Sequence, residues 1–286
     1  MKIGIDMPTA VEGFDGTTML EWARLADAGP FSSVGVIDRI AFPNFDGLTT
    51  LAAVAAVTKR VRLLTSVLML PMRNATLFAK QAATIDVISN GRLTLGLSVG
   101  IREADFAATQ VSLRGRGNRF DEQLATIKRI WAGEPAVEGG EPVGPMPARK
   151  GGPEILIGGW APRAVARVGP WGDGYITGQG PDTIMKTYGM ALKSWEENGR
   201  EGKPRLVASV AYNLGPKALE GAEKFHNRYW AYNPGFGQRY RDSTFLTIQR
   251  IKDYADEMEA LGVDELILVP CEHGVEQMHR LTEGLA

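Results

Sequence analysis

The sequence predicts a single (β/α)₈ TIM barrel, an α/β fold with insertion loops, over residues 1–286. The chain length is ordinary for one such barrel, which takes roughly 250 residues. An open dinucleotide-binding sheet would need a GxGxxG turn after the first apolar run. The absence of that turn argues against this alternative. Short apolar runs alternate with segments of helical period, and eight runs are present: residues 3–5, 34–37, 62–70, 93–99, 155–157, 175–176, 206–210 and 266–269.

The segments between these runs have the apolar spacing of amphipathic helices. Phe120, Leu124, Ile127 and Trp131, for example, recur three or four residues apart. Residues 132–153 break this alternation, because they are dense in glycine and proline. We interpret them as a long surface connection inserted into the barrel, not as a linker between domains.

Residues 226–243 form a second irregular segment, with aromatic side chains among glycine, proline and arginine. A polar surface loop does not need so many aromatics. The segment is therefore either a loop packed on the barrel or a mobile flap over a ligand, and we expect it to border the mouth of the barrel. Its aromatic residues are Tyr229, Trp230, Tyr232, Phe236 and Tyr240.

The composition excludes several classes of partner. The formal net charge is −1 and no basic block is present, which argues against nucleic acid or an anionic membrane as a partner. No apolar run approaches the roughly 20 residues that a membrane span needs. The only cysteine, Cys271, cannot form an internal disulfide, and the N-terminus turns polar too soon for a signal peptide. We expect a cytoplasmic protein.

Several common kinds of catalytic site are missing. His226, His273 and His279 lack metal-ligand spacing, so no metal site is predicted. No GxSxG elbow and no phosphate-binding P-loop is present. Cys271 directly follows the last apolar run, where a small packed residue is more common than a nucleophile.

Chemistry in a (β/α)₈ barrel lies at the carboxyl ends of the strands. The residues at those ends include few titratable groups and many small ones. Such a mouth suits a large planar cofactor that carries the reactivity itself, and does not suit hydrolysis by paired carboxylates. The residues are Asp6, Met7, Asp38, Arg39, Ser66, Val67, Ser98, Val99, Gly100, Gly158, Gly159, Trp160, Thr177, Gly178, Tyr212, Asn213, Pro270, Cys271 and Glu272.

The turn after the fifth run is the most informative local motif. Gly158 and Gly159 end an apolar strand, Trp160 and Ala161 follow, and Pro162 stands where a helix would begin. Two glycines let the backbone approach an anion closely, and a helix N-terminus stabilises negative charge. The motif indicates either a phosphate site or a left-handed turn that needs glycine.

Three stretches resemble the bacterial luciferase-like superfamily of flavin- and deazaflavin-dependent oxidoreductases: residues 48–100, 116–131 and 154–174. The central run AKQAATIDVISNGRL is the longest ordered match, and MEALGVDELIL fits the family's last helix and strand. The resemblance covers nearly the whole chain and is weakest over residues 177–242. It implies a barrel that binds its cofactor in the mouth.

The resemblance also implies roles for individual residues. Ser66 and Val67 fall where the family has a bulge with a non-prolyl cis peptide, pressed against the flavin ring. The flavin phosphate is expected over the turn from Gly158 to Ala161, through Gly159 and Trp160. We place three further strand-end residues beside the cofactor: Asp6, Ser98 and Val99.

Two departures from the family pattern affect the expected chemistry. Many members carry histidine after the second strand in an acidic-His pair, whereas this chain has Asp38 and Arg39. Arginine cannot act as a neutral acid–base group, so Arg39 would pair an anionic group of substrate or cofactor, or the two residues would form only a salt bridge. We keep both as candidate catalytic residues. Val99 stands where luciferase itself has a phosphate-binding arginine, which disfavours the light-emitting reaction.

The resemblance therefore implies an FMN-dependent oxidoreductase, a monooxygenase acting on a mostly apolar small organic molecule. The alternatives are hydride transfer with the deazaflavin coenzyme F420 and a flavin-binding barrel without turnover. We expect a homodimer and a separate flavin reductase as a partner.

Overall fold

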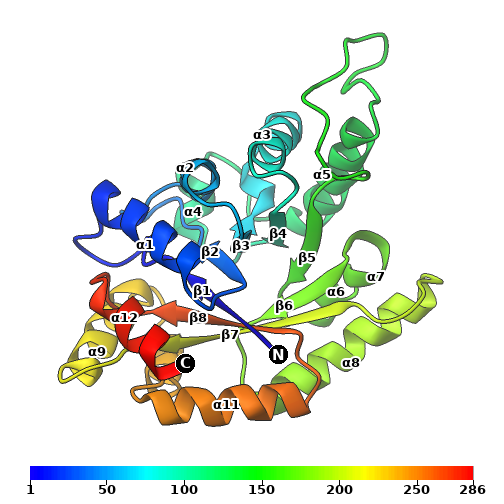
Figure 1. Cartoon of the computed structure of the whole chain (residues 1–286). Coiled ribbons are helices and arrows are strands. Elements are labelled where there is room, and N and C mark those ends of the chain that lie inside the picture. The colour runs from blue at the N-terminus through cyan, green and yellow to red at the C-terminus, as the bar shows by residue number, and fades with distance from the viewer. Residues whose placement is uncertain (286) are drawn as a thin grey trace.

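The computed structural model describes residues 1–285, and its strands close into a parallel barrel in chain order (Figure 1). Each strand pairs with the next one along the chain, and β8 pairs with β1. The predicted (β/α)₈ barrel is confirmed, and each apolar run of the sequence is a strand. The strands are β1 (Lys2–Asp6), β2 (Ser33–Val36), β3 (Arg62–Met69), β4 (Leu93–Ser98), β5 (Glu154–Gly158), β6 (Gly174–Thr177), β7 (Arg205–Tyr212) and β8 (Glu265–Pro270).

Helices surround the barrel, and several begin at polar side chains that cap them. Asp15, Asp46 and Asn74 each accept a hydrogen bond from a backbone N–H of the first turn, which satisfies a donor that the helix itself leaves free. The helices are α1 (Gly16–Ala28), α2 (Gly47–Val57), η1 (Leu70–Met72), α3 (Ala75–Ile88), α4 (Glu103–Ala108), α5 (Arg116–Trp131), α6 (Pro162–Val165), α7 (Val168–Trp171), α8 (Pro181–Glu197), α9 (Ala218–Tyr229), α10 (Pro234–Asp242), α11 (Ile248–Ala260) and α12 (Glu276–Leu285).

Two apolar layers hold the strands in place. The larger one lies between strands and helices, and the predicted face of α5 is buried in it. The smaller one contains one side chain from each of β3, β5, β6, β7 and β8, on which the half-buried Val67 packs. Packed apolar side chains of this kind fill the inside of a (β/α)₈ barrel and support the residues at its mouth. The smaller layer consists of Leu64, Leu156, Ile176, Val207 and Ile267.

Charged residues at the starts of the strands pair with one another. Arg205 binds Glu154 at 2.7 Å and also pairs with Glu265, while Arg62 lies 3.3 Å from Glu154. These pairs lie at the amino-terminal ends of β3, β5, β7 and β8. These charged groups are thus paired with one another, and they lie at the end of the barrel where (β/α)₈ enzymes carry no active site.

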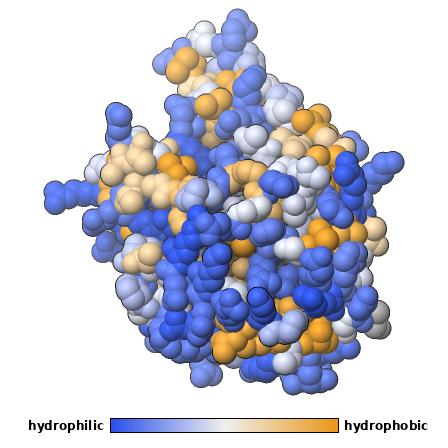
Figure 2. Space-filling view, turned by 90° about the vertical axis from the view of Figure 1, so that its left-hand side faces the viewer, coloured by the Kyte–Doolittle hydropathy of each residue, from blue (hydrophilic) through white to orange (hydrophobic). Residues whose placement is uncertain are grey.

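Residues 132–153 contain no helix or strand and project from the barrel beside α5 (Figure 1), as predicted for an inserted surface connection. Hydrophilic side chains cover most of the face that Figure 2 shows, with hydrophobic residues in separate small groups. Within residues 1–285, no helix combines the length and hydropathy that a membrane crossing needs.

Candidate functional site

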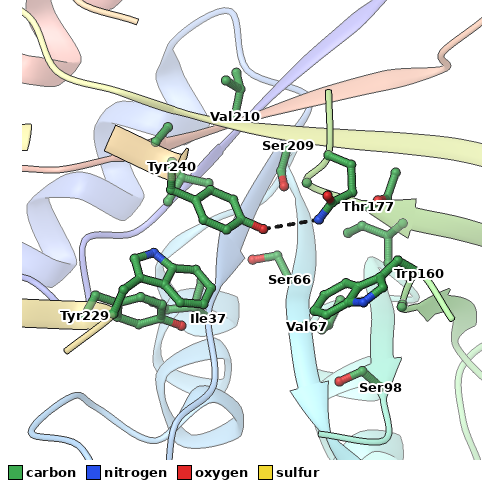
Figure 3. Close-up of a pocket in the computed structure, with 18 of the residues that line it drawn as sticks. Ile37, Ser66, Val67, Ser98, Trp160, Thr177, Ser209, Val210, Tyr229 and Tyr240 are labelled. Carbon is green, nitrogen blue, oxygen red and sulfur yellow. Dashed lines mark hydrogen bonds between the residues drawn. The ribbon is translucent and has the colours of Figure 1, made fainter. Parts of the chain in front are cut away.

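A cavity of about 830 Å³ opens at the carboxyl ends of the strands. Residues in or just after the carboxyl ends of β2 to β8 form its floor and one side, and residues of α9, α10 and α11 form the other side. Figure 3 shows Ser66 at the centre, with Tyr240 and Trp160 on opposite sides of it. The cavity thus occupies the position at which this fold carries its active sites.

The floor of the cavity is a bulge in β3. Ser66 and Val67 are joined by a cis peptide bond, and the pairing of β3 with β4 shifts register between Thr65 and Leu68. Both features confirm the prediction for this strand. Because of the bulge, the neighbouring Ser66 and Val67 both line the cavity, whereas a regular strand would point successive side chains to opposite faces.

Glycines in the adjacent strands make room for this bulge. A Cβ atom at Gly96 of β4 would lie only 2.1 Å from the carbonyl oxygen of Thr65. One at Gly158 of β5 would lie 3.1 Å from a methyl group of Val67. The bulge and these glycines therefore fit together as one apolar platform.

Asp6 lies behind the platform and does not line the cavity. Its Oδ2 accepts a hydrogen bond from Ser66 Oγ at 2.6 Å, while its Oδ1 has no partner within residues 1–285. Burial raises the pKa of the Asp6 carboxyl to about 7, although the hydrogen bond from Ser66 opposes this shift. Asp6 can thus affect a bound ring only through Ser66, not by the direct contact expected from the sequence.

Asp38 and Arg39 do not pair with each other. Arg73 forms a two-pronged ion pair with Asp38, with both distances 2.9 Å. Arg39 Nε lies 3.2 Å from Oδ2 of the fully buried Asp105. The alternative of an Asp38–Arg39 salt bridge is therefore wrong. Asp38 lines the cavity, whereas Arg39 lies outside the lining, and both charges are occupied by other partners.

The turn after β5 forms one side of the cavity, with Gly158, Gly159, Trp160 and Ala161 all in the lining. Gly159 has a φ of +138°, which disfavours side chains, and its carbonyl oxygen accepts a hydrogen bond from Tyr175 Oη at 2.6 Å. The turn is therefore held in place. Its binding of phosphate remains a prediction.

The end of β4 borders the same cavity. Ser98 and Val99 are both in the lining and are half-buried. The carbonyl oxygen of Gly100, the next residue, accepts a hydrogen bond from Arg116 Nε at 2.9 Å. Both residues thus line the cavity, and their contact with a cofactor remains a prediction.

Residues 226–243 border the mouth, as predicted, but as helices and not as a loop. They contain the end of α9 and all of α10, which Asn233 caps. Trp230 and Tyr240 stack with ring centroids 4.6 Å apart. We call the aromatic residues that line the cavity here the aromatic wall: Tyr229, Trp230, Tyr232 and Tyr240.

His226 also lines the cavity, a position that the sequence did not indicate. Burial lowers the pKa of its imidazole to about 4, and the charge of Arg241 contributes. Its Nε2 lies 2.8 Å from Thr244 Oγ1, which itself donates to the carbonyl oxygen of Tyr240. Nε2 also lies 3.7 Å from Sγ of the buried Cys271, and Nδ1 is buried without a hydrogen-bond partner within residues 1–285.

The chain is similar to several known proteins. The model of the luciferase-like monooxygenase family matches residues 1–265. An uncharacterized protein of Mycobacterium tuberculosis is 29% identical over 221 residues, which covers 65% of this chain and 74% of that protein. The F420-dependent glucose-6-phosphate dehydrogenase of Beutenbergia cavernae is 30% identical over 206 residues, covering 64% and 59%.

A solved structure extends the likeness over the full chain. The monooxygenase RslO1 from Streptomyces bottropensis superposes with a TM-score of 0.83 at 22% sequence identity. The match covers 100% of this chain and 98% of that structure. At this level of identity the likeness establishes the shared fold only.

Proposed function

Because the chain belongs to the luciferase-like monooxygenase family, whose members are oxidoreductases that use FMN or F420, we propose that it is an FMN-dependent monooxygenase. Its substrate is then a mostly apolar small organic molecule, and a separate reductase supplies reduced FMN. The observation that carries this proposal is the platform of Ser66 and Val67, which suits one face of a flavin ring. At the family's histidine position this chain has Arg39, which is paired with Asp105 and is not a free acid–base group.

The cavity is large enough to hold FMN. Its volume of about 830 Å³ falls within the roughly 300–1,000 Å³ of small-molecule sites. Val67 would support one face of the planar ring. The turn at Gly159 and Trp160 would hold the phosphate, because a glycine backbone allows the close approach of an anion.

FMN, when bound, supplies the electron transfer to oxygen, and the residues of this chain hold and shield it. The aromatic wall covers the mouth and excludes water, which strengthens polar interactions inside. Arg39 is paired with Asp105 and is always protonated, so it cannot exchange protons with substrate. This arrangement suits oxygenation better than an alcohol–ketone conversion, which needs a proton carrier.

Hydride transfer with F420 is the second candidate, and two observations favour it. The relative from Beutenbergia cavernae is named as an F420-dependent dehydrogenase. In addition, His226 lines the cavity, burial lowers its pKa to about 4, and its Nδ1 has no hydrogen-bond partner within residues 1–285. His226 would then take the place of the family histidine as the proton carrier.

Parallel reactions separate the two candidates. One contains FMN, NADH and a separate flavin reductase under isotopically labelled oxygen, and the other contains reduced F420 without oxygen. A panel of apolar ketones and aldehydes is added to each, and products are analysed by mass spectrometry. Labelled oxygen in a product of the first reaction supports the monooxygenase. Reduced product from the second reaction alone would replace it by the F420 enzyme.

A further inference from the structure

Arg102 follows β4 and lines the cavity, although only 8% of its surface is exposed. Its guanidinium carbon lies 4.7 Å from the ring centre of Tyr229, 5.1 Å from that of Trp230 and 4.8 Å from that of Tyr232. These aromatic faces favour a cation. Although burial lowers the pKa of Arg102, Tyr229 and Tyr232 raise it overall through charge and side-chain hydrogen bonds.

Arg102 forms no ion pair within residues 1–285. Its Nε is buried and makes no hydrogen bond, and no carboxylate lies within 4.0 Å of the guanidinium in the part of the chain that the structure describes. A buried guanidinium with an unpartnered Nε and no carboxylate beside it is unfavourable, because burial removes its water. An acceptor from outside the chain would satisfy it.

The nearby carboxylates are already engaged. Asp105 accepts hydrogen bonds from Arg39 and from the backbone N–H groups of Ile40 and Ala41. Asp38 is paired with Arg73. These carboxylates are therefore not free to neutralise Arg102.

Arg116 adds a second cation to the same lining. Its side chain donates to the carbonyl oxygens of Gly100 and Leu113, and it forms no ion pair within residues 1–285. Arg102 and Arg116 are therefore both guanidinium groups of the lining without carboxylate partners, and Arg250 of α11 is a third. This side of an otherwise apolar cavity is complementary to an anion.

We propose that Arg102, assisted by Arg116, forms a subsite for an anionic oxygen group, a carboxylate or phosphate, borne by an organic molecule that contacts the aromatic wall. This inference rests on the proposed function, and it makes the ligand amphiphilic instead of merely apolar. The anion belongs either to the substrate or to the side chain of the cofactor. Arginine binds both kinds of group through paired N–H donors.

Binding of matched probes to the cofactor-free protein tests the subsite. Benzoate and inorganic phosphate are the anions, and benzamide is the neutral counterpart of benzoate. Trp230 lies against Arg102, so tryptophan fluorescence reports occupancy. We expect benzoate to bind better than benzamide, and Arg102→Met to weaken benzoate binding about tenfold or more. Arg102→Lys should retain part of the affinity, because it keeps the charge without the planar fork.

A matched control is Arg129→Met, which removes an exposed arginine from α5, outside the cavity lining. It should leave benzoate binding unchanged. If Arg102→Met does not fold, Arg102→Lys and the contrast between benzoate and benzamide in the wild type carry the test. Failure of benzoate and phosphate to bind the wild type, or equal binding of either anion to wild type and Arg102 variants, would overturn the proposal.

Titrations with FMN, riboflavin and F420 identify the source of the anion. If Arg102→Met weakens FMN or F420 but not riboflavin, the anion belongs to the cofactor. If it weakens benzoate and leaves all three unchanged, the anion belongs to the substrate. Both results support the subsite. Anion binding without any binding of FMN or F420 would contradict the proposed function while leaving the subsite in place.

Discussion

Replacing Asp6 by asparagine should remove a pH dependence from the stability of the protein. Burial raises the pKa of this carboxyl from 3.8 to about 7. Between these values the folded protein keeps a proton that the unfolded chain has released. The contribution of Asp6 to stability is therefore fully present below pH 3.8 and is lost as the pH rises to about 7.

The expected size of the effect follows from the width of this window. Each pH unit changes the free energy of unfolding by about 1.4 kcal/mol for one proton. Between pH 5 and pH 8 the wild type should lose about 3 kcal/mol through this group, because most of the change occurs below pH 7. Asparagine has a similar shape and can accept the hydrogen bond from Ser66, but it does not titrate.

Urea unfolding followed by circular dichroism at intervals from pH 5 to pH 8 measures the difference. The stability of Asp6→Asn relative to wild type should rise with pH by about 3 kcal/mol. Asp256→Asn, on the exposed surface of α11, controls for the loss of a carboxylate. A constant difference between Asp6→Asn and wild type across this range would refute the reasoning.

Three further predictions concern the turn, the buried ion pair and the histidine. Gly159→Ala should weaken FMN binding and cost about 1–3 kcal/mol in urea unfolding, because its Cβ would lie 2.8 Å from Ala164 at a φ of +138°. Gly139→Ala, also at positive φ but with open space around it, should leave FMN binding intact. Arg39→Met should cost about 3 kcal/mol in urea unfolding by leaving the Asp105 carboxylate without its cation, and a loss below about 1 kcal/mol would contradict this. His226→Gln should reduce the fall in stability from pH 6.5 to about 4, where the wild-type unfolded chain binds a proton that the folded protein excludes; an unchanged acid limb would contradict this.

The barrel was predictable because its signals are local. Each strand is a short apolar run, and the double-glycine turn at Gly158 and Gly159 ends β5 as expected. The bulge at Ser66 and Val67 was also predicted, but the family resemblance carried that prediction. A polar residue within a leucine-rich strand does not by itself specify a bulge.

The polar partners at the site were not predictable, because they come from distant parts of the chain. Asp38 binds Arg73, 35 positions later, and Arg39 binds Asp105, 66 positions later. The sequence around Asp38 and Arg39 does not indicate which charged side chains lie next to them in the fold. For the same reason the sequence does not show that Arg102 lacks an ion pair, because this depends on which residues the nearby carboxylates bind.

The segment over residues 226–243 was misjudged for a different reason. Its glycines and aromatics suggested a loop, but Asn233 and Pro234 are good starting residues for a helix. Asn233 indeed accepts a hydrogen bond from the N–H of Phe236 and starts α10. This capping signal would have predicted the helix.

The central claim is that a flavin or deazaflavin ring binds on the platform at Val67. The direct measurement is the dissociation constant for FMN and for F420, taken from ligand fluorescence, in the wild type and in Val67→Asp. The claim predicts that the folded wild type binds at least one of them and that Val67→Asp weakens that binding about tenfold or more, because a charge replaces the apolar surface under the ring. Equal binding by a folded Val67→Asp variant, or no binding of either cofactor by the wild type, would contradict the claim.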